Sequence, residues 1–424
     1  MMSKNRIVAA IDVGSSKVST IIGQISEEDE RINIVGASSI PSLGVRKGQI
    51  VDIEEAGEVI VKSVESAERM AGFSLNHILV SVGGGHVSSQ NSHGVVAVAE
   101  PQGEISSEDV RRVIEAARAV SIPSSREILH VIPRTYTVDS QDGVAAPIGM
   151  SGIRLEVETH IITGSSTSIK NLTKCVSEIG AEIDALVFSG IASAEAVLSG
   201  TEKELGVVLV DIGGGTTSLV VFLEGSPAFT SVLPIGAKNV TNDLAIGLRL
   251  SLESAEKLKL ALSNRDLKKE DKEEEDIDLA KLGIYEETKT VSRKTIVEGI
   301  IKPRLNEIFG MVAEEISKSG MAGLTPSGIV LTGGGASTAG AVETCKKCLS
   351  LPVRIGIPDK VKGLVDDIMD PSFAAGIGLL LYGAKRESGS PGTSRFSNFG
   401  KMAKKIPIKG LFGKIVSFVK SFLP

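Results

Sequence analysis

Two segments, at residues 8–22 and 208–221, repeat one pattern along the chain. In each of them an apolar run leads into an Asp-apolar-Gly step, a turn of small residues follows, and a second apolar run returns. An apolar run, a tight turn and a second apolar run predict two neighbouring antiparallel strands. The sequence therefore contains one strand-turn-strand unit twice, and the fold has to accommodate both copies.

The two turns have the composition of phosphate-binding loops. Small residues let the backbone approach an anion closely, and successive N–H groups in such a turn form a concave nest of donors. The aspartate at the end of each first strand is placed to hold Mg²⁺ directly or through water. Two ordinary glycine-rich hairpins are the alternative, but the matched flanks and aspartates favour a paired clamp on one polyphosphate.

The residues predicted to bind the polyphosphate belong to the two turns and their flanking strand ends. They are Asp12, Gly14, Ser15, Ser16, Lys17, Asp211, Gly213, Gly214, Gly215, Thr216 and Thr217. Hydroxyl groups among them add donors to the backbone nest. Asp12 and Asp211 are the predicted metal ligands.

A third glycine cluster extends the pattern. An apolar run at residues 327–332 ends in Gly333, Gly334 and Gly335, and a helical stretch follows at residues 339–349. Glycine at this point lets a flat purine lie against the backbone near a helix N-terminus.

A second helical stretch is predicted at residues 251–263. Glu256, Lys259 and Ser263 share one face of it, at spacings of three and four. A solvated, charged helix face is the alternative interpretation of these three residues.

The order of the two phosphate turns and the glycine-rich strand end resembles the actin-like ATPase superfamily. The resemblance implies an α/β fold in which two lobes, built on a duplicated core, close over ATP. It also implies that Glu256, Lys259 and Ser263 reach the adenosine from the second lobe, and that Gly236 approaches the nucleotide at a lobe hinge. Residues 370–381, which are rich in small side chains, resemble the helix that closes the core.

A block at residues 84–162 sits between the two repeats. It opens within three consecutive glycines, contains an amphipathic helix at residues 107–120, and returns through a strand at residues 128–139. These signals predict a small, separate α+β subdomain. The block and the following residues, up to 164, closely resemble the FtsA family of bacterial cell-division proteins, in which a subdomain called 1C replaces the usual lobe-one subdomain of actin. Ala146 departs slightly from that pattern, because the family often has Asp there.

This resemblance implies a division of the chain into six parts. They are the lobe 1 core at 1–83 and 163–205, the inserted 1C-type subdomain at 84–162, the lobe 2 core at 206–231 and 302–384, the lobe 2 subdomain at 232–301, a flexible linker at 385–403, and an amphipathic helix at 404–424.

Composition agrees with two lobes. The 424 residues are 42% hydrophobic but only 3% aromatic, with no Trp, so the cores are expected to be aliphatic. No stretch approaches the eighteen continuous apolar residues of a spanning helix, and no secretory signal precedes the first strand. With three cysteines, these features favour a cytoplasmic location.

The C-terminal stretch predicts a membrane-binding helix. Residues 401–424 carry six lysines and no acidic residue, which leaves −12 on the remainder of a chain whose formal net charge is −6. On a helical projection the eight apolar residues between 411 and 423 fill one arc of about 160°. A basic amphipathic helix suits an anionic membrane surface, and the alternative is docking on the protein's own core or on a partner. The predicted membrane-binding residues are Lys409, Leu411, Phe412, Lys414, Ile415, Val416, Phe418, Val419, Lys420, Phe422 and Leu423.

The family resemblance also implies partners. In FtsA proteins the lobe 2 subdomain receives the C-terminal tail of the tubulin-like protein FtsZ, which is typically acidic and apolar. Arg293 and Lys294 are the candidate residues for pairing with it, and an ordinary surface helix is the alternative. The other expected partners are further copies of the chain in a polymer, anionic lipids and later division proteins, with no nucleic acid.

Nucleotide binding is better supported by the sequence than nucleotide hydrolysis. Ser189 stands in the link between the lobes where relatives place the Glu or Gln that orients the attacking water, and serine is a poor substitute. ATP is therefore expected to act as a ligand that closes the lobes and favours a polymer-competent state.

The expected function is an ATP-binding scaffold that polymerises on the cytoplasmic membrane face at the division site, ties FtsZ filaments to the membrane and recruits later division proteins. An FtsA-like pilus-assembly protein is the first alternative, although it would not need a membrane-binding tail. A small-molecule kinase of the same superfamily is less well supported, since no catalytic Asp motif or sugar-binding segment is present.

Overall fold

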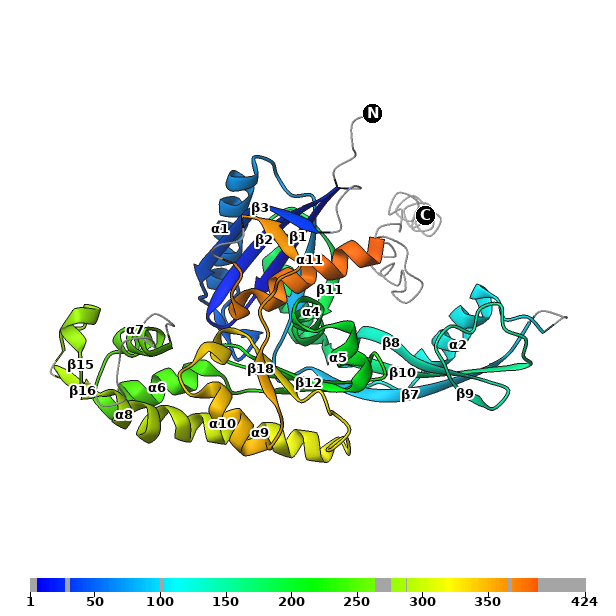
Figure 1. Cartoon of the computed structure of the whole chain (residues 1–424). Coiled ribbons are helices and arrows are strands. Elements are labelled where there is room, and N and C mark those ends of the chain that lie inside the picture. Colours follow the sequence, from blue (N-terminus) through cyan, green and yellow to red (C-terminus); the bar gives the residue numbers. More distant parts are fainter. Residues whose placement is uncertain are drawn as a thin grey trace, which may run out of the picture.

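The computed structural model describes residues 6–26, 31–99, 103–263, 276–286, 288–364 and 368–387. Within these ranges the chain forms two lobes, and a separate subdomain projects from the first lobe (Figure 1). The predicted amphipathic helix at 404–424, and with it every predicted membrane-binding residue, lies outside the described residues. In the described ranges, no helix is both long enough and apolar enough to cross a membrane.

The first lobe is built on a six-stranded sheet in the order β11-β6-β1-β2-β3-β19. Its strands are β1 (Arg6–Val13), β2 (Lys17–Ile25), β3 (Ile32–Pro41), β6 (His77–Val82), β11 (Glu182–Phe188) and β19 (Val361–Gly363). Residues 8–11 of β1 are buried without interruption, as is typical of a central strand covered on both faces. The covering helices are α1 (Ile53–Ala71), which packs on β2 and β3, and α11 (Ala374–Glu387), which packs on β1, β2 and β6 (Figure 1).

Shorter elements complete the first lobe and its connection to the second. They are the hairpin β4 (Val45–Arg46) and β5 (Gln49–Ile50), α3 (Ser166–Ser177), α4 (Ser189–Val197) and α5 (Gly200–Leu205). Helix α3 packs against α1, whereas α4 packs against α11.

The second lobe repeats the central arrangement of the first. Its sheet has the order β14-β13-β12-β17-β18. The strands are β12 (Val207–Ile212), β13 (Thr217–Leu223), β14 (Ser226–Leu233), β17 (Ile329–Thr332) and β18 (Val353–Ile355). β12 pairs antiparallel with β13 and parallel with β17, just as β1 pairs antiparallel with β2 and parallel with β6. The duplicated two-lobed α/β core that the sequence predicts is therefore present.

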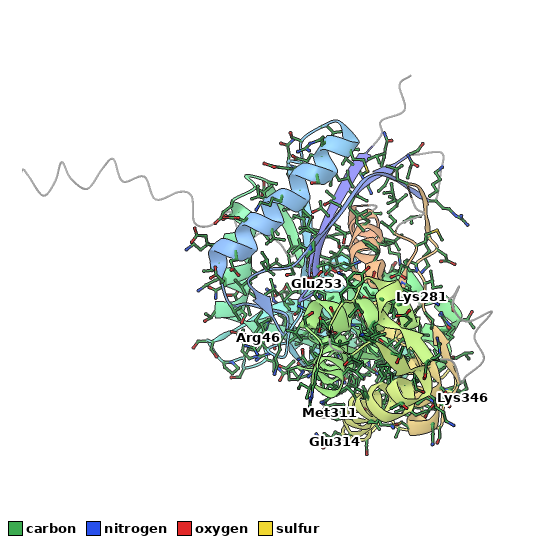
Figure 2. The ribbon with its side chains drawn as sticks, turned by 90° about the vertical axis from the view of Figure 1, so that its left-hand side faces the viewer. Arg46, Glu253, Lys281, Met311, Glu314 and Lys346 are labelled. Atoms are coloured by element: carbon green, nitrogen blue, oxygen red, sulfur yellow. The ribbon has the colours of Figure 1, made fainter. Side chains whose placement is uncertain are left out.

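Helices and a small hairpin extend the second lobe. They are α6 (Ala237–Leu248), α7 (Leu252–Ser263), β15 (Asp276–Asp278), η2 (Leu279–Leu282), β16 (Thr290–Ser292), α8 (Arg293–Ile296), the π-helical turn η3 (Val297–Ile301), α9 (Lys302–Lys318), η4 (Gly334–Ser337) and α10 (Ala341–Leu349). In Figure 2 the exposed side chains Glu253, Lys281, Met311, Glu314 and Lys346 mark the surface of this region.

The block between β6 and α3 forms its own α+β subdomain, as predicted. It contains β7 (Ser88–Ala97), α2 (Ser107–Arg118), β8 (Arg126–Val138), β9 (Gln141–Val144) and β10 (Arg154–Ser165), with the sheet order β7-β10-β8-β9. Ile105, Val113, Tyr136 and Leu155 belong to a hydrophobic core separate from those of the lobes. Figure 1 shows this inserted subdomain extending sideways from the body of the molecule.

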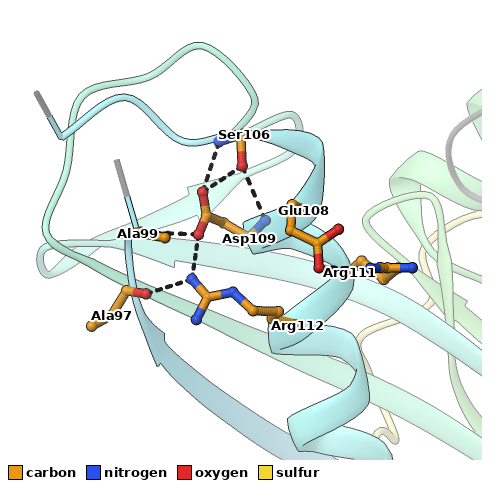
Figure 3. Close-up of polar contacts among 7 residues, drawn as sticks. All are labelled: Ala97, Ala99, Ser106, Glu108, Asp109, Arg111 and Arg112. Carbon is orange, nitrogen blue, oxygen red and sulfur yellow. Dashed lines mark hydrogen bonds and ion pairs between the residues drawn. The ribbon is translucent and has the colours of Figure 1, made fainter. Parts of the chain in front are cut away.

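A capping network fixes α2 to the sheet of the inserted subdomain (Figure 3). The Ser106 side chain caps the helix by accepting from the Asp109 backbone N–H, and Asp109 accepts in return from the Ser106 backbone N–H at 3.0 Å. The fully buried Asp109 carboxylate also accepts from the Ala99 N–H at 3.1 Å and from Arg112. Burial by itself raises the pKa of Asp109, but the hydrogen bonds from Ser106, Arg112 and Ala99 outweigh it and hold the pKa well below its usual range.

The end of the described chain differs from the division that the sequence implies. The range 302–384 is expected to lie entirely in lobe 2, but β19 pairs with β3, and α11 packs on the sheet of lobe 1. Phe373 and Ile377 accordingly belong to the core of the first lobe. Small residues make this packing possible, since a Cβ on Gly378 would overlap the Ala192 carbonyl oxygen of α4. Small residues permit close helix packing without indicating which lobe is the partner, so the sequence pattern cannot distinguish the two.

We expect Asp109→Ala to lower the free energy of local opening of α2 by about 2–4 kcal/mol, because it leaves buried donors without an acceptor. Hydrogen exchange of the α2 amides measures this change. Because hydrogen bonding depresses the pKa of Asp109, its contribution is present at neutral pH and declines as the pH falls below about 4. Glu108→Gln is the matched control on the same helix: it removes an exposed ion pair with Arg111 and should cost less than about 0.5 kcal/mol. Equal effects of the two changes would contradict this account.

Candidate nucleotide site

The two predicted phosphate turns have the same local geometry. In the first, the Gly14 N–H donates to the Lys17 carbonyl at 3.0 Å, and in the second the Gly213 N–H donates to the Thr216 carbonyl at 2.8 Å. Each turn joins two antiparallel strands, and each is preceded by its aspartate at the end of the first strand. The repeat in the sequence is thus a repeat in structure.

The two turns meet across the boundary between the lobes. A Cβ on Gly214 would overlap the Ser16 side chain, and a Cβ on Gly215 would lie 2.8 Å from the Ser15 Oγ. The Lys238 Nζ, from the second lobe, donates to the Ser15 carbonyl at 2.7 Å. Because the turns are in direct contact, a phosphate group seated between Ser16 and Gly214 requires them to move apart.

Asp12 and Asp211 are both partly buried in the site, and each accepts a hydrogen bond from a serine. Ser81 Oγ on β6 donates to Asp12 at 2.6 Å, and Ser193 Oγ on α4 donates to Asp211 at 2.6 Å. Burial raises the pKa of Asp12, although the Ser81 hydrogen bond and the charge of Lys17 act against it.

Burial also raises the pKa of Asp211, to about 6, with the charge of Asp12 adding to the effect and the Ser193 hydrogen bond opposing it. Two neighbouring, partly buried carboxylates favour a bound cation. Among the described residues, no group of three or more His, Cys, Asp and Glu side chains forms a complete metal site. The pair therefore suits an ion such as Mg²⁺, which takes one or two carboxylates and completes its coordination with water and phosphate.

Lys17 connects the first turn to the segment before α11. Its Nζ donates to the Ser372 Oγ at 2.8 Å and lies 3.1 Å from the centroid of the Phe373 ring. Burial lowers the pKa of Lys17 to about 8, with Asp12 and Asp370 acting in the opposite direction. Ser372 and Phe373 belong to the short helix η5 (Pro371–Phe373).

The third glycine cluster lies against the second turn. Gly333 has a φ of +79°, and a Cβ there would overlap the Asp211 carboxylate, so glycine is required for both reasons. The Gly333 N–H donates to the Pro371 carbonyl at 3.1 Å. A Cβ on Gly335 would overlap the Ile212 side chain, and one on Gly334 would lie 3.4 Å from Ser372. The structure therefore brings this predicted cluster to Asp211 and to the same segment that holds Lys17.

The first turn of α6 rests on the second phosphate turn. The Ala237 and Lys238 N–H groups donate to the Gly213 and Gly214 carbonyls at 2.9 and 2.8 Å. Gly236 permits this approach, because a Cβ there would press on both of those carbonyl groups. In the strand that leaves the turn, the Thr217 hydroxyl donates to the Ile235 carbonyl at 2.9 Å.

The predicted face of α7 is turned toward the start of α6. The Lys259 Nζ is buried and donates to the Glu256 carboxylate at 2.7 Å and to the Thr241 hydroxyl at 2.9 Å. The Ser263 hydroxyl donates to the Lys259 carbonyl at 2.7 Å. Lys259 is thus a buried residue beside α6 instead of part of a solvated charged face.

The candidate partner-binding residues lie outside this cluster. Arg293 and Lys294 form the start of the short helix α8, next to the β15–β16 hairpin, and the Lys294 side chain is exposed. Ser189 begins α4, and it is Ser193, one turn later, that contacts Asp211.

Four residues of the site were not predicted. Ser81, Ser193, Lys238 and Ser372 contact the predicted residues from β6, α4, α6 and η5. Ser81 did leave a signal in the sequence, because it is the only polar residue in the otherwise apolar run from Ile78 to Val82. Ser193 lies in a run of small residues, which is typical of a helix packing surface. Nothing in the local sequence distinguishes Lys238 or Ser372.

A large cavity of about 1020 Å³ lies elsewhere, between the inserted subdomain, β11 and α11. His130, Glu195 and Tyr382 are among its lining residues, and none of the predicted nucleotide-binding residues is. The candidate nucleotide site therefore lies where the two turns meet, and this cavity is a separate feature.

Two family models match the chain. The model described as "SHS2 domain inserted in FTSA" matches residues 84–163, and the model described as "Cell division protein FtsA" matches residues 208–378. The first match falls on the inserted subdomain, and the second on most of the second lobe together with the segment that returns to the first.

Curated relatives match over nearly the full length. The cell division protein FtsA of Borreliella burgdorferi is 39% identical over 421 residues, which covers 99% of this chain and 98% of the relative. The cell division protein FtsA of Pseudomonas aeruginosa is 38% identical over 398 residues, with 91% of each chain covered. That of Bacillus subtilis is 38% identical over 384 residues, covering 91% of this chain and 85% of the relative.

Solved structures with low sequence identity share the fold. The "PilM-PilN type IV pilus biogenesis complex" aligns with a TM-score of 0.63 at 17% identity, covering 89% of this chain and 98% of the other. MreB5 of Spiroplasma citri, solved bound to AMPPNP, aligns with a TM-score of 0.53 at 14% identity, covering 91% and 99%. At these identities the likeness concerns the actin-like fold alone.

We expect Asp211→Asn to stabilise the protein at pH 8 in the absence of metal and nucleotide, by about 1–3 kcal/mol. The sign follows from the raised pKa: the folded state holds a proton that the unfolded state releases, so ionisation above pH 6 costs stability. The gain should shrink toward zero at pH 4, where the wild-type carboxyl is protonated in the folded state. Urea denaturation at the two pH values measures it. Asp142→Asn, at an exposed position of strand β9, is the control and should change the stability at neither pH. A gain from Asp211→Asn that is the same at both pH values would contradict the assignment.

Proposed function

The chain belongs to the FtsA family of bacterial cell-division proteins, and we propose that it acts in division as a nucleotide-controlled membrane tether for the tubulin-like protein FtsZ. Its nucleotide is ATP with Mg²⁺, and it assembles with further copies of itself. The observation that carries the nucleotide part of the proposal is that the two phosphate turns meet through Ser16 and Gly214, while the third glycine cluster lies against Asp211.

The roles proposed for the site residues follow from their positions. Backbone N–H groups and hydroxyls of the two turns bind the phosphates, with Lys17 as the charged partner. Asp12 and Asp211 hold Mg²⁺ directly or through water. Glu256, Lys259, Ser263 and the glycines at 333–335 face the nucleoside, and Gly236 lets α6 approach it. That the fold neighbour MreB5 was solved bound to AMPPNP supports a nucleotide as the ligand.

Nucleotide binding changes the relation between the lobes in this proposal. The turns touch through Ser16 and Gly214, so a polyphosphate separates them and is then clamped by both. A polymer whose contacts involve both lobes assembles only at a suitable lobe angle, so nucleotide occupancy controls assembly through the population of that state. The proposal requires no hydrolysis, in keeping with Ser189 at the link between the lobes.

The membrane and FtsZ parts rest on the sequence and on the family. The basic amphipathic stretch at 404–424 binds anionic lipid on the cytoplasmic face, weakly for one copy and more tightly when a polymer presents several. The lobe 2 subdomain, with Arg293 and Lys294, receives the acidic and apolar FtsZ tail, and the inserted subdomain at 84–162 takes part in recruiting later division proteins. Figure 2 views lobe 2 from the side that carries Lys281, which lies between β15 and β16.

We expect Mg-ATP to bind the wild-type protein, and Asp211→Asn to weaken that binding by about tenfold, because a metal ligand is lost. Titration with a fluorescent ATP analogue, with and without Mg²⁺, measures the affinity. Asp243→Asn is the matched control, since Asp243 lies on the neighbouring helix α6 but pairs with Arg304. Equal affinity of the wild type and Asp211→Asn, or no ATP binding by the wild type, would refute the nucleotide site.

For the tether, we expect the full chain with Mg-ATP to carry an FtsZ C-terminal peptide onto vesicles that contain anionic lipid. A chain that ends at residue 400 should no longer bind the vesicles but should still bind the peptide, because only the lipid-binding stretch is removed. The double variant Arg293→Glu and Lys294→Glu should still bind the vesicles but should no longer bind the peptide, because the new negative charges repel an acidic peptide. Co-sedimentation measures both.

The matched control for the charge reversal is Lys346→Glu with Lys347→Glu, two exposed lysines on α10 of the same lobe. If the truncated chain still bound vesicles, the proposed role of residues 404–424 in membrane binding would be contradicted. Equal peptide loss in both double variants would remove the assignment of Arg293 and Lys294.

A further inference from the structure

The inserted subdomain belongs to lobe 1 by its place in the chain, yet it is hydrogen-bonded to lobe 2. The contact joins β7, the edge strand of the inserted sheet, to β14, the edge strand of the lobe 2 sheet. The two edges are linked through side chains of β7 and β10, and no backbone ladder between β7 and β14 is formed in the described residues.

Ser89 takes the place of a neighbouring strand for one residue of β14. Its Oγ donates to the Thr230 carbonyl at 2.9 Å and accepts from the Thr230 N–H at 3.1 Å. Both backbone groups of Thr230 are therefore satisfied by one side chain from the other lobe. An edge strand that carried them unpaired and buried would lose stability.

Asn91 and His160 extend the contact on both sides of Thr230. The Asn91 Nδ2 donates to the Ala228 carbonyl at 3.2 Å, and the Asn91 Oδ1 lies 2.7 Å from the His160 Nδ1. The His160 Nε2 lies 3.0 Å from the Thr230 hydroxyl. If His160 carries its proton on Nδ1, it donates to Asn91 and accepts from Thr230, so every polar group in the set has a partner.

His160 is suited to this position because it is neutral. It is 1% exposed, and burial lowers its pKa to about 3, with the charges of Arg134 and His130 acting in the same direction. A neutral imidazole offers one donor and one acceptor, and the network uses each once.

We propose that Ser89, Asn91 and His160 form a brace that binds the inserted subdomain to Thr230 of β14 and so restrains the two lobes from separating. The residue that the brace holds, Thr230, is close in the chain to the second phosphate turn. Leu233, three residues after Thr230, pairs with Thr217 at the end of the second turn, and β14 then leads through Pro234 to Gly236. Movement of β14 is thereby transmitted to the turn that contacts Ser16.

This inference deepens the proposed function, on which its consequence for nucleotide rests. If the turns must part to admit a polyphosphate, the brace sets how easily they part, and a partner that displaced the inserted subdomain would loosen the site. The restraint on the lobes themselves does not depend on any ligand.

The first test measures lobe separation without nucleotide. Spin labels on Cys348, exposed on α10 of lobe 2, and on an introduced Glu65→Cys, exposed on α1 of lobe 1, report the distance between the lobes by double electron–electron resonance. The other two cysteines are buried. We expect Ser89→Ala and Thr230→Val each to broaden the distance distribution and shift its mean to longer values.

Thr159→Val is the matched control. Thr159 precedes His160 on β10 and is fully buried, but its hydroxyl donates to the Ser92 carbonyl inside the inserted subdomain at 3.2 Å. Its distance distribution should match that of the wild type. Distributions in Ser89→Ala and Thr230→Val that match the control would overturn the brace.

The second test follows the Thr230 amide by hydrogen exchange, because Ser89 accepts its N–H. Ser89→Ala should accelerate its exchange by about tenfold or more, while Thr159→Val leaves it unchanged. Mg-ATP should also change this rate in the wild type. Absence of ATP binding by the wild type would refute the proposed function. The distance measurement would still show whether the brace restrains the lobes, because it is made without nucleotide. ATP binding that left the Thr230 amide unaffected would overturn its coupling to the nucleotide site.

Discussion

The partial burial of two aspartates at the ends of equivalent strands is the constraint on which the rest of the structure depends. Asp12 and Asp211 each accept from a serine, and the charge of Asp12 helps to raise the pKa of Asp211. Carboxylates with limited access to water are most stable when a cation or several donors satisfy them. The strands that carry them are central in both sheets. The electrostatic balance of the site is therefore tied to the relative position of the two lobes.

The sequence predicts local chemistry well here, and tertiary partners poorly. The strand-turn-strand units and the glycine-rich turns are readable because each depends on residues adjacent in the chain. Ser193 and Ser372 cannot be found in this way, since they meet their partners only after helices pack against sheets. The spacing of residues in α7 predicts that Lys259 and Glu256 share one helix face, and the two side chains are in contact. The burial of Lys259 depends on its contact with α6, which the spacing within α7 cannot indicate. The assignment of α11 to the wrong lobe has the same origin.

The inserted subdomain is built around a core of its own and contacts both lobes. It has its own apolar core, and Asp109 fixes its helix to its sheet. Its contacts with β14 are polar and involve few side chains. Polar contacts of this kind exchange readily with water or with a partner's groups, whereas the apolar cores of the lobes do not. Its attachment to lobe 1 is apolar, since Ile162 of β10 lies in the core of that lobe and Leu129 and Ile132 of β8 pack against it.

The close packing of α11 on α4 has a mechanical consequence. Glycine at 378 leaves the two backbones in contact, with no side chain between them to absorb strain, and Glu195 on α4 also pairs with Lys385 near the end of α11. On its other side α4 presents Ser193 to Asp211. The pair therefore links Ser193, and through it the Asp211 carboxylate, to the end of α11. A force that displaced the end of α11 would therefore act on the hydrogen bond between Ser193 and Asp211.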